Sequence, residues 1–342
     1  MSKPNTISEE DGASLASFDV EERSSLGLRI ATSAIDALFK FEPFFAFACE
    51  KARKKIIDRA DMIGVGWADS VDEMKRNMDA LQAEYDGLLD NQVWESTPEY
   101  YKAPFHAYPE GNLCWKAAME VEPSALSVHA NIFTDKGEFE ANGDDHLRSN
   151  FHRRMREMMA VKEPMDIVDI GCSTGLSTLK LAETFNQAKT ITGVDLSPHM
   201  LSVARHNLRT REEQAYARGR VSYIHAPGEK TGLEEGSADL VSLCLTSHEL
   251  PAEATREVFR EAYRLLRPGG AISFMDMNPL SLAFQRLAGN PFAFAGFKST
   301  EPYLQEYIAL DLGHELQEAG FMTPEVRPNS PRHRTCVAYV AK

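Results

Sequence analysis

The stretch MDIVDIGCSTGLSTLKLAETFNQAKTITGVDLSP, residues 165–198, decides the fold. Met165–Ile170 is a short apolar run that ends before a glycine, as expected for a strand buried on both faces. Leu176–Phe185 carries apolar residues at helical spacing, and Lys189–Val194 has the pattern of a second strand. The stretch therefore predicts a strand, a tight turn, a helix and a second strand, with Asp195 at the carboxyl end.

The turn after the first strand is bracketed by Gly171 and Gly175, so no bulky side chain blocks a ligand from the backbone. Asp195 follows at close to the roughly 20-residue spacing at which nucleotide-binding units place a carboxylate for ribose hydroxyls. A dinucleotide site would need a glycine where Ser173 stands, and a phosphate-binding P-loop would need a lysine where Leu176 stands. We therefore predict a ligand that has a ribose and no phosphates.

Three motifs, in this order, carry a resemblance to a known family. They are Asp169-Ile-Gly-Cys-Ser-Thr-Gly175, Gly193-Val-Asp195-Leu-Ser-Pro and Leu266-Arg-Pro-Gly-Gly270. They resemble motif I, the second motif and the loop before the fifth strand of class I S-adenosylmethionine-dependent methyltransferases. The resemblance implies an α/β fold with a doubly wound, Rossmann-like, seven-stranded sheet and an antiparallel last strand. The core also looks like the ubiquinone and menaquinone methyltransferases.

The resemblance implies S-adenosyl-L-methionine as the cofactor and a set of residues that bind it. The implied cofactor-binding residues are Asp169, Gly171, Cys172, Ser173, Gly175, Asp195, Leu196, His225, Ala226, Glu229 and Leu245. Many relatives carry Asp or Asn directly before the alanine that follows the third strand, where this chain has His225. The contact to the adenine amino group is therefore open between His225 and Glu229.

Composition excludes several classes of protein. The chain has 342 residues, a net charge of −14 and a pI near 5.2, which argues against a nucleic-acid surface. Its five cysteines are scattered, so we expect neither a metal site nor disulfides. We therefore expect the protein to reside in a reducing compartment. The N-terminus lacks a secretory signal pattern. We expect a cytoplasmic protein, with a plastid as the alternative, and leave the oligomeric state open.

The chain is predicted to have three regions. They are an acidic tail (residues 1–25), a helical region over the active-site mouth (26–144) and the methyltransferase domain (145–342). Further predicted strands are Val221–His225, Asp239–Leu245, Ala271–Asp276 and Thr335–Val340. Helical patterns are expected at Leu28–Phe39, Phe44–Ala60, Trp115–His129, Asp145–Ala160, Pro251–Leu266 and Tyr303–Ala319, and Ser197 and Pro198 begin another helix.

Two apolar segments could contact a substrate or a membrane. Phe44–Ala60 places an FFAFA run beside lysines, so it could pack on the domain or transiently touch an anionic membrane surface. Leu280–Thr300 is apolar and broken by Gly and Pro, which favours a lid or pocket wall over a membrane flap or simple core packing. The aromatic loop Glu99–Met119 could line a ligand site or merely be anchored at the surface. In it, His106 and Tyr108 are substrate-binding candidates.

Candidate catalytic residues follow the fourth and fifth strands, because reacting groups cluster outside the carboxyl ends of parallel strands. His248 is the natural proton acceptor, and Glu249 could orient it. Asp276 is a third catalytic candidate, and Asn278 a substrate-binding one. The alternatives are that His248 caps a helix, that Glu249 favours a helix dipole, and that Asp276 bonds backbone amides.

The run Arg332-His333-Arg334 precedes the last predicted strand and is a candidate for binding a substrate anion, since guanidinium groups suit carboxylates. A solvated or internally paired loop is the alternative. The segments Phe105–Trp115 and Asn329–Thr335 also resemble an uncharacterised methyltransferase family of cyanobacteria and plastid-bearing eukaryotes. That resemblance implies no substrate.

We predict S- or O-methylation of a small, carboxylate-bearing organic molecule by in-line methyl transfer. A quinone or prenyl-lipid ring methyltransferase is the main alternative, because of the apolar segments and the menaquinone-like core. A third possibility is a protein that binds S-adenosylmethionine without catalysis.

Overall fold

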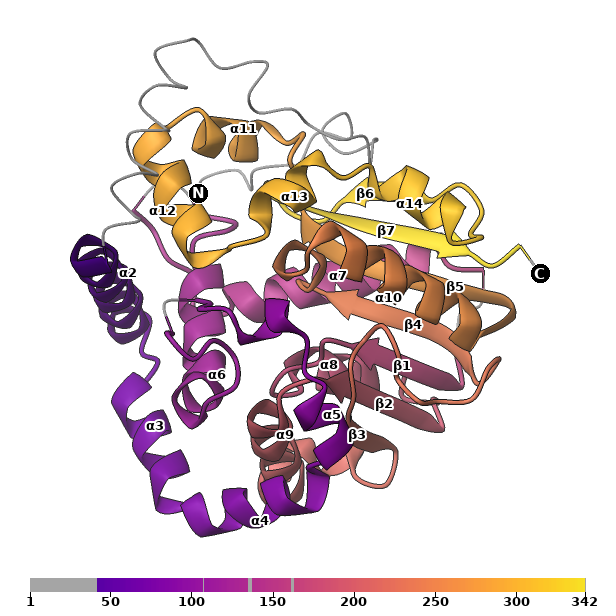
Figure 1. Ribbon diagram of the computed structural model, residues 1–342, viewed down its shortest axis with the longest axis horizontal. Helices are drawn as coiled ribbons and strands as arrows, with labels where there is room; N and C mark the ends of the chain where they lie inside the picture. The colour runs from indigo at the N-terminus through magenta and orange to yellow at the C-terminus, as the bar shows by residue number, and fades with distance from the viewer. Residues whose placement is uncertain (1–41, 107, 135–136, 161–162, 342) are drawn as a thin grey trace, which may run out of the picture.

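The computed structural model describes residues 42–106, 108–134, 137–160 and 163–341 (Figure 1). The predicted acidic tail and the predicted helix at Leu28–Phe39 lie outside the described residues. The helices of the described chain are α2 (Glu42–Met62), α3 (Trp67–Arg76), α4 (Met78–Leu88), α5 (Asn91–Glu95), α6 (Trp115–His129), α7 (Gly143–Met158), α8 (Leu176–Thr184), α9 (Pro198–Thr210), α10 (Ala252–Leu265), α11 (Leu282–Ala288), α12 (Pro291–Thr300), α13 (Leu304–Ala309) and α14 (Leu312–Glu318). Short 3-10 turns are η2 (Glu99–Lys102), η3 (Glu212–Ala217) and η4 (Ser247–Glu249).

A seven-stranded sheet in the order β3-β2-β1-β4-β5-β7-β6 forms the centre of the molecule. Its strands are β1 (Asp166–Ile170), β2 (Thr190–Asp195), β3 (Val221–His225), β4 (Ala238–Cys244), β5 (Leu266–Met277), β6 (Glu325–Pro328) and β7 (His333–Tyr339). The first five run parallel, and β7 is antiparallel to both β5 and β6. The predicted doubly wound fold with an antiparallel last strand is confirmed.

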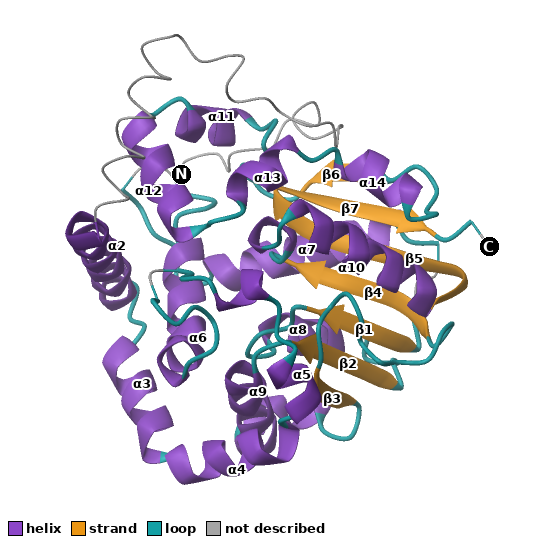
Figure 2. Cartoon of the chain, viewed as in Figure 1, coloured by secondary structure: helices purple, strands orange, loops and turns teal. Residues whose placement is uncertain are grey.

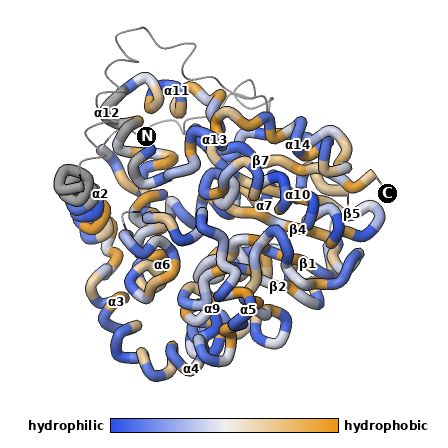
Figure 3. Tube along the Cα trace, in the orientation of Figure 1, coloured by the Kyte–Doolittle hydropathy of each residue, from blue (hydrophilic) through white to orange (hydrophobic). Residues whose placement is uncertain are grey.

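Two layers of helices cover the sheet, because neighbouring residues of each buried strand point to opposite faces. Ile167 of β1 packs in a cluster with α7, α8 and α9, while Val168 packs in the cluster that contains α10, α13 and α14. Helix α10 presents Ala254, Val258 and Phe259 to the sheet and charged residues to solvent, so polar and apolar positions alternate along it in Figure 3.

Several predicted boundaries agree with the structure. Ser197 caps α9 by accepting a hydrogen bond from the Met200 amide, with Pro198 in the first turn, and α6 has the predicted bounds. The predicted helix at Tyr303–Ala319 is split, because the Asp311 side chain caps a new helix, α14. Strand β6 carries no strand-like pattern of its own, since it has four residues and ends at a proline on the sheet edge.

The N-terminal helices pack against the domain and reach the carboxyl ends of the parallel strands (Figures 1 and 2). A separate apolar cluster joins Met74 of α3, Leu81 of α4 and Ala118 of α6 to Val203 of α9. Glu84 of α4 also pairs with arginines of α9. In the described part of the chain, no helix has both the length and the apolar character that a bilayer crossing requires.

Candidate active site

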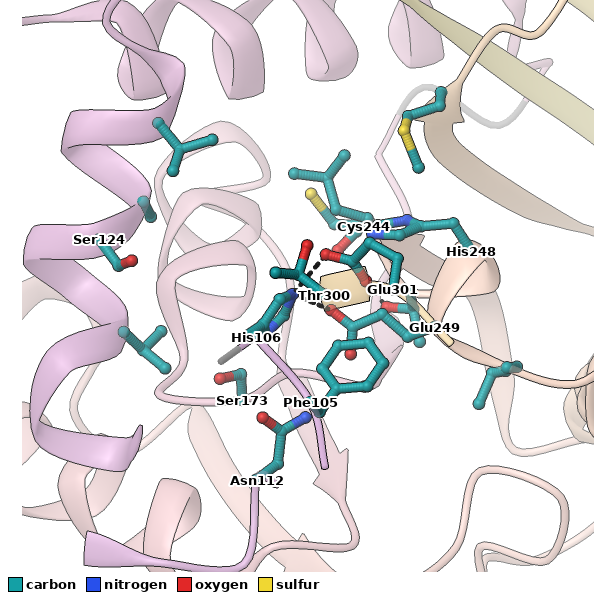
Figure 4. Close-up of a pocket in the computed structure, with 18 of the residues that line it drawn as sticks. Phe105, His106, Asn112, Ser124, Ser173, Cys244, His248, Glu249, Thr300 and Glu301 are labelled. Carbon is teal, nitrogen blue, oxygen red and sulfur yellow. Dashed lines mark hydrogen bonds and ion pairs between the residues drawn. The ribbon is translucent and has the colours of Figure 1, made fainter. Parts of the chain in front are cut away.

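A cavity of about 520 Å³ lies at the carboxyl ends of the parallel strands, within the range of small-molecule sites. Its walls come from strand ends, from the aromatic loop after η2, from α6 and from the segment α11–α12. Phe284, Leu287 and Phe297 belong to that last segment and line the cavity, as the pocket-wall interpretation of Leu280–Thr300 requires. Figure 4 shows a close-up, with His106 at the centre.

The turn after β1 has the backbone shape that its glycines allow. Gly171 and Gly175 have φ of 72° and 84°, in the left-handed region that favours glycine. A Cβ at Gly171 would lie 2.5 Å from Thr246, and one at Gly175 would lie 2.3 Å from the Tyr223 hydroxyl. The glycines are therefore required by close packing within the protein, and only Gly171 lines the cavity.

Asp195 is the best-anchored acid of the cavity. Its Oδ2 accepts a hydrogen bond from the Ser173 amide at 2.8 Å, and its Oδ1 accepts one from the Ser197 amide at 2.8 Å. The Tyr101 hydroxyl donates a further hydrogen bond to Oδ1 at 3.0 Å. Burial raises the pKa of Asp195, although these donors oppose the shift. The carboxylate thus stands at the end of β2, ready to accept from a ligand's hydroxyl groups.

Asp169 lies beneath the turn, with no exposed surface. Its Oδ2 accepts hydrogen bonds from the Ser177 and Thr178 hydroxyls at 2.6 and 2.7 Å. Burial raises the pKa of Asp169 to about 6, although these donors oppose the shift. The residue ties the start of α8 to β1 and does not line the cavity, so its contribution to a ligand site is to hold the turn.

His225 and Glu229 have different surroundings in the structure. Both nitrogens of the His225 ring are used, because Nδ1 accepts from the Asp90 amide at 3.0 Å and Nε2 lies 3.1 Å from the Leu196 carbonyl. Glu229 lines the cavity and accepts a hydrogen bond from the Tyr100 hydroxyl. The sequence left the adenine contact open between the two, and this geometry favours Glu229.

His248 and Asp276 form a buried pair at the ends of β4 and β5. His248 Nδ1 lies 2.7 Å from Asp276 Oδ1, and Asp276 Oδ2 accepts from the His248 amide at 3.1 Å. Burial disfavours the imidazolium, but the Asp276 carboxylate outweighs it and raises the pKa of His248 to about 10. The predicted orienting role of Glu249 is therefore corrected to Asp276, which also bonds the Met277 amide.

Glu249 instead faces His106 across the cavity, together with Glu301 (Figure 4). His106 Nε2 lies 3.1 Å from Glu301 Oε1 and 3.6 Å from Glu249 Oε1. Burial opposes the charge on His106, but the two carboxylates raise its pKa. Burial also raises the pKa of Glu249 to about 7.

The backbone of His106 is held in an uncommon conformation. Its φ is 49°, and its backbone amide donates to the Thr300 carbonyl at 3.1 Å.

The run Arg332-His333-Arg334 is divided by the start of β7 at His333. Arg332 and His333 line the cavity, whereas Arg334 is 1% exposed, lies beside Tyr307 and does not line it. Arg334 was predicted to bind the substrate, and this prediction is corrected. Position 334 pairs with Asp276 of β5, and its side chain points into the core. His333 is buried, and its Nδ1 lies 2.7 Å from the Ser330 hydroxyl.

Two other substrate-binding candidates have structural contacts. Asn278 is 1% exposed and lies outside the cavity lining; its Oδ1 accepts from the Leu280 amide at 3.1 Å. The backbone amide of Asn278 donates to the Arg332 carbonyl at 2.8 Å and so fixes the loop that carries Arg332. The prediction that Asn278 binds the substrate is therefore corrected to a supporting role. Tyr108 does line the cavity, and its hydroxyl donates to Glu120 at 2.7 Å.

Comparison with known proteins agrees with this geometry. Residues 168–274 match the family model described as a methyltransferase domain. They contain the turn after β1, Asp195 and most of the parallel sheet. This chain contains a class I S-adenosylmethionine-dependent methyltransferase domain. The methyltransferase is an enzyme, and its cofactor is S-adenosylmethionine.

Similar proteins include an uncharacterised methyltransferase of Synechocystis, 29% identical over 172 residues, which are 50% of this chain and 73% of the relative. A demethylmenaquinone methyltransferase of Lactococcus lactis is 26% identical over 49% of this chain and 61% of its own length. An O-methyltransferase family protein of Burkholderia thailandensis has a TM-score of 0.46 at 17% identity, over 73% of this chain and 69% of its own. The methyltransferase thus spans about three fifths to three quarters of these relatives.

The implied cofactor-binding residues of the methyltransferase divide into two groups. Those that line the cavity are Gly171, Ser173, Asp195, Leu196, Glu229 and Leu245. Those that lie behind the lining are Asp169, Cys172, Gly175, His225 and Ala226. The cavity wall formed by Ser173, Asp195 and Leu196 fits the ribose of the cofactor, because the Asp195 carboxylate reaches the cavity there.

Sequence reasoning missed several polar residues of the cavity, among them Tyr100, Tyr101, Arg148 and Glu301. The two tyrosines stand at the start of the aromatic loop, whose composition was a usable signal. Arg148 lies in α7 and is paired with Asp144. Glu301 follows α12 and had no signal, because only the fold brings it to His106.

Proposed function

We propose that this methyltransferase methylates an O or S atom of a small, carboxylate-bearing molecule. One observation carries the proposal. Arg332 lines the cavity and donates to Asn131 Oδ1 at 2.9 Å, and among the described residues no carboxylate lies within ion-pair distance of it. Burial and the nearby Arg59 lower the pKa of Arg332, so a bound carboxylate would relieve both effects. Arg332 is thus suited to hold the acceptor by its anion.

The chemistry needs alignment more than acid or base power. When bound, the cofactor supplies an electrophilic methyl group on a sulfonium, which leaves as a neutral thioether. Asp195 and Glu229 would hold the adenosine, with Tyr101 beside the ribose position. His248 is kept charged by Asp276, so it cannot act as the predicted proton acceptor. It would instead stabilise the ionised form of a nearby hydroxyl or thiol that has released its proton to solvent, so the acceptor attacks as an anion. The apolar α11–α12 wall would exclude water.

The proposal is tested by incubating the pure enzyme with methyl-labelled S-adenosylmethionine and a soluble metabolite extract. We expect labelled products whose chromatographic retention changes when a carboxylate is esterified. Arg332→Gln should reduce labelling of these products by about tenfold without weakening S-adenosylhomocysteine binding. Labelled products confined to neutral lipids would contradict the proposal.

A quinone or prenyl-lipid ring is the second candidate acceptor. It is favoured by the aromatic wall formed by Phe284 and Phe297, and by relatives named demethylmenaquinone methyltransferase. A ring substrate would make turnover depend on a membrane extract and leave it insensitive to Arg332→Gln. The two candidates therefore predict opposite results in the same pair of extracts.

A further inference from the structure

The cavity contains a buried carboxylate oxygen for which the described part of the chain supplies no hydrogen-bond donor. Glu301 is only 6% exposed, and its Oε1 lies 3.1 Å from His106 Nε2. Its Oε2 is buried and has no hydrogen-bond partner among the residues that the structure describes. Buried carboxylate oxygens are costly to leave without a donor, so this position of the cavity wall calls for one.

The charges around Glu301 do not balance. Glu249 and Glu301 share a single imidazole, that of His106. Of the other imidazoles that line the cavity, His248 is paired with Asp276 and His129 with Asp144, and the pKa of His333 is lowered. Among the described residues, one negative charge is therefore left without a counter-charge in a largely enclosed site. Burial and the neighbouring Glu301 raise the pKa of Glu249, the direction expected where a cation is lacking.

The remaining arginines of the cavity cannot supply this cation, because each has another partner. Arg53 pairs with Glu120, and Arg148 pairs with Asp144 at 2.9 Å. Arg332 has the opposite situation, a positive charge that no described carboxylate meets. Burial and the positive charges of Arg332, His129 and His248 lower the pKa of His333, which also lines the cavity. The same cavity thus offers one unmet anion and one unmet cation.

We propose that the acceptor is a zwitterion, whose ammonium group binds Glu301 and Glu249 while its carboxylate binds Arg332. This inference rests on the function proposed above and narrows its substrate class to amino acids or compounds that keep both groups. The ammonium would donate to Glu301 Oε2 and to Glu249. Among the described residues, no group of His, Cys, Asp and Glu is arranged to hold a metal ion.

Product chemistry tests the inference whatever the identity of the acceptor. Products labelled by the wild-type enzyme in a soluble extract are treated with an amine-acylating reagent and, separately, with a carboxylate-esterifying reagent. We expect both treatments to shift the chromatographic retention of the main labelled product. A main product that reacts only as a carboxylate would overturn the zwitterion and leave the proposed function intact. A product with neither group, or no labelled product, would overturn both.

A variant separates the acceptor's ammonium from the cofactor's own cationic groups. Glu301→Gln keeps the shape of the side chain, and Glu318→Gln removes the same charge from an exposed position of α14 as a control. We expect Glu301→Gln to slow labelling of the amine-bearing product by about tenfold or more, since a buried charge pair is lost. The dissociation constants of S-adenosylmethionine and S-adenosylhomocysteine, measured by calorimetry, should stay within about twofold.

The other outcomes of this variant count against the inference. Equal weakening of both cofactor forms would mean that Glu301 binds the amino group of the cofactor. Weakening of S-adenosylmethionine alone would mean that it faces the sulfonium. Labelling equal to that of Glu318→Gln would mean that Glu301 binds no cation. Thermal unfolding of each variant checks that the fold is retained.

Discussion

The two halves of the cavity are built in different ways. The part proposed to hold the cofactor, the cofactor half, comes from one continuous stretch, from the turn after β1 to Glu229, apart from Leu245, and its Asp195 carboxylate is positioned by neighbouring backbone amides. The substrate half joins His106, His248, Glu301 and Arg332, which come from four distant segments. The difference teaches that cofactor recognition depends on local geometry, whereas acceptor recognition depends on long-range packing.

The halves also differ in how well their charges are satisfied. Asp195 accepts three hydrogen bonds from the protein, and both of its carboxylate oxygens are used. In the substrate half, Glu301 Oε2 has no donor and Arg332 has no carboxylate among the described residues. We infer that the cofactor half is preformed and that the substrate half is completed by its ligand. Mutations in the two halves should therefore separate cofactor affinity from acceptor turnover.

The largest effect is expected for Asp195→Ala. The variant should bind S-adenosylhomocysteine about 100-fold more weakly or worse, because two charge-assisted hydrogen bonds of roughly 1.5–3 kcal/mol each are lost. Calorimetry measures this, with Asp58→Ala as a control, since Asp58 is an exposed acid of α2. Unchanged affinity in Asp195→Ala would contradict the division into two halves, because the cofactor would then bind elsewhere.

The next effect is expected for His248→Asn. We expect kcat to fall by about 100-fold, because a positive charge beside the reacting atom is lost, while cofactor affinity stays the same. Wild-type turnover should also fall as pH rises through about 10, where His248 loses its proton. His314→Asn is the control, at an exposed histidine of α14. A loss of cofactor affinity equal to the loss in kcat would show that the halves are not separable.

Stability gives an independent check on the charge of His248. Its pKa in the folded protein is about 10, above its ordinary value of 6.5. The stabilisation from this charge is therefore fully present below pH 6.5 and is lost as pH rises through about 10. Urea unfolding at pH 6.5 and 9.5 should show a larger loss for the wild type than for His248→Asn. Parallel losses in the two proteins would argue that the pair is neutral.

A smaller effect is expected for Arg332→Gln, which removes the acceptor's anchor and leaves the methyl-transfer site in place. The Michaelis constant for a carboxylate-bearing acceptor should rise by about tenfold, since a charge-assisted hydrogen bond is worth roughly 1.5–3 kcal/mol, while kcat changes little. Arg260→Gln, on the exposed face of α10, is the matched control. A drop in kcat without a change in the Michaelis constant would assign Arg332 to positioning the loop.

The sequence predicted the sheet and the turn after β1 well, because their signals are local. A glycine pair, a strand tip and the Ser197 cap are each set by a few neighbouring residues, and the sheet follows from the order of the strands. The local pattern could not indicate which side chains face the cavity. Asp169 and His225 belong to the right motifs, yet strand pairing and packing point both behind the lining.

The substrate half was predicted in part. His106, His248 and Arg332 were named as candidates, but their partners were not, since each partner comes from another segment. Glu249 was paired with His248 because they are adjacent in sequence. In the fold, the short η4 turn sends the two side chains to different partners. Nothing in the sequence could place Glu301 beside His106, because that contact depends on how α12 ends against the aromatic loop.

The smallest effect, and the sharpest test of how preformed the cofactor half is, is expected for Tyr101→Phe. The Tyr101 hydroxyl donates to the Asp195 oxygen that a ribose hydroxyl would also use. If the ribose displaces it, removal of the hydroxyl should tighten S-adenosylhomocysteine binding by about 2- to 10-fold, the value of one net hydrogen bond. Tyr303→Phe is a suitable control, because its hydroxyl donates to the Tyr100 carbonyl and, among the described residues, to no carboxylate. Weaker binding in Tyr101→Phe would mean that the tyrosine remains in contact with the bound cofactor, and that the N-terminal region then contributes to both halves.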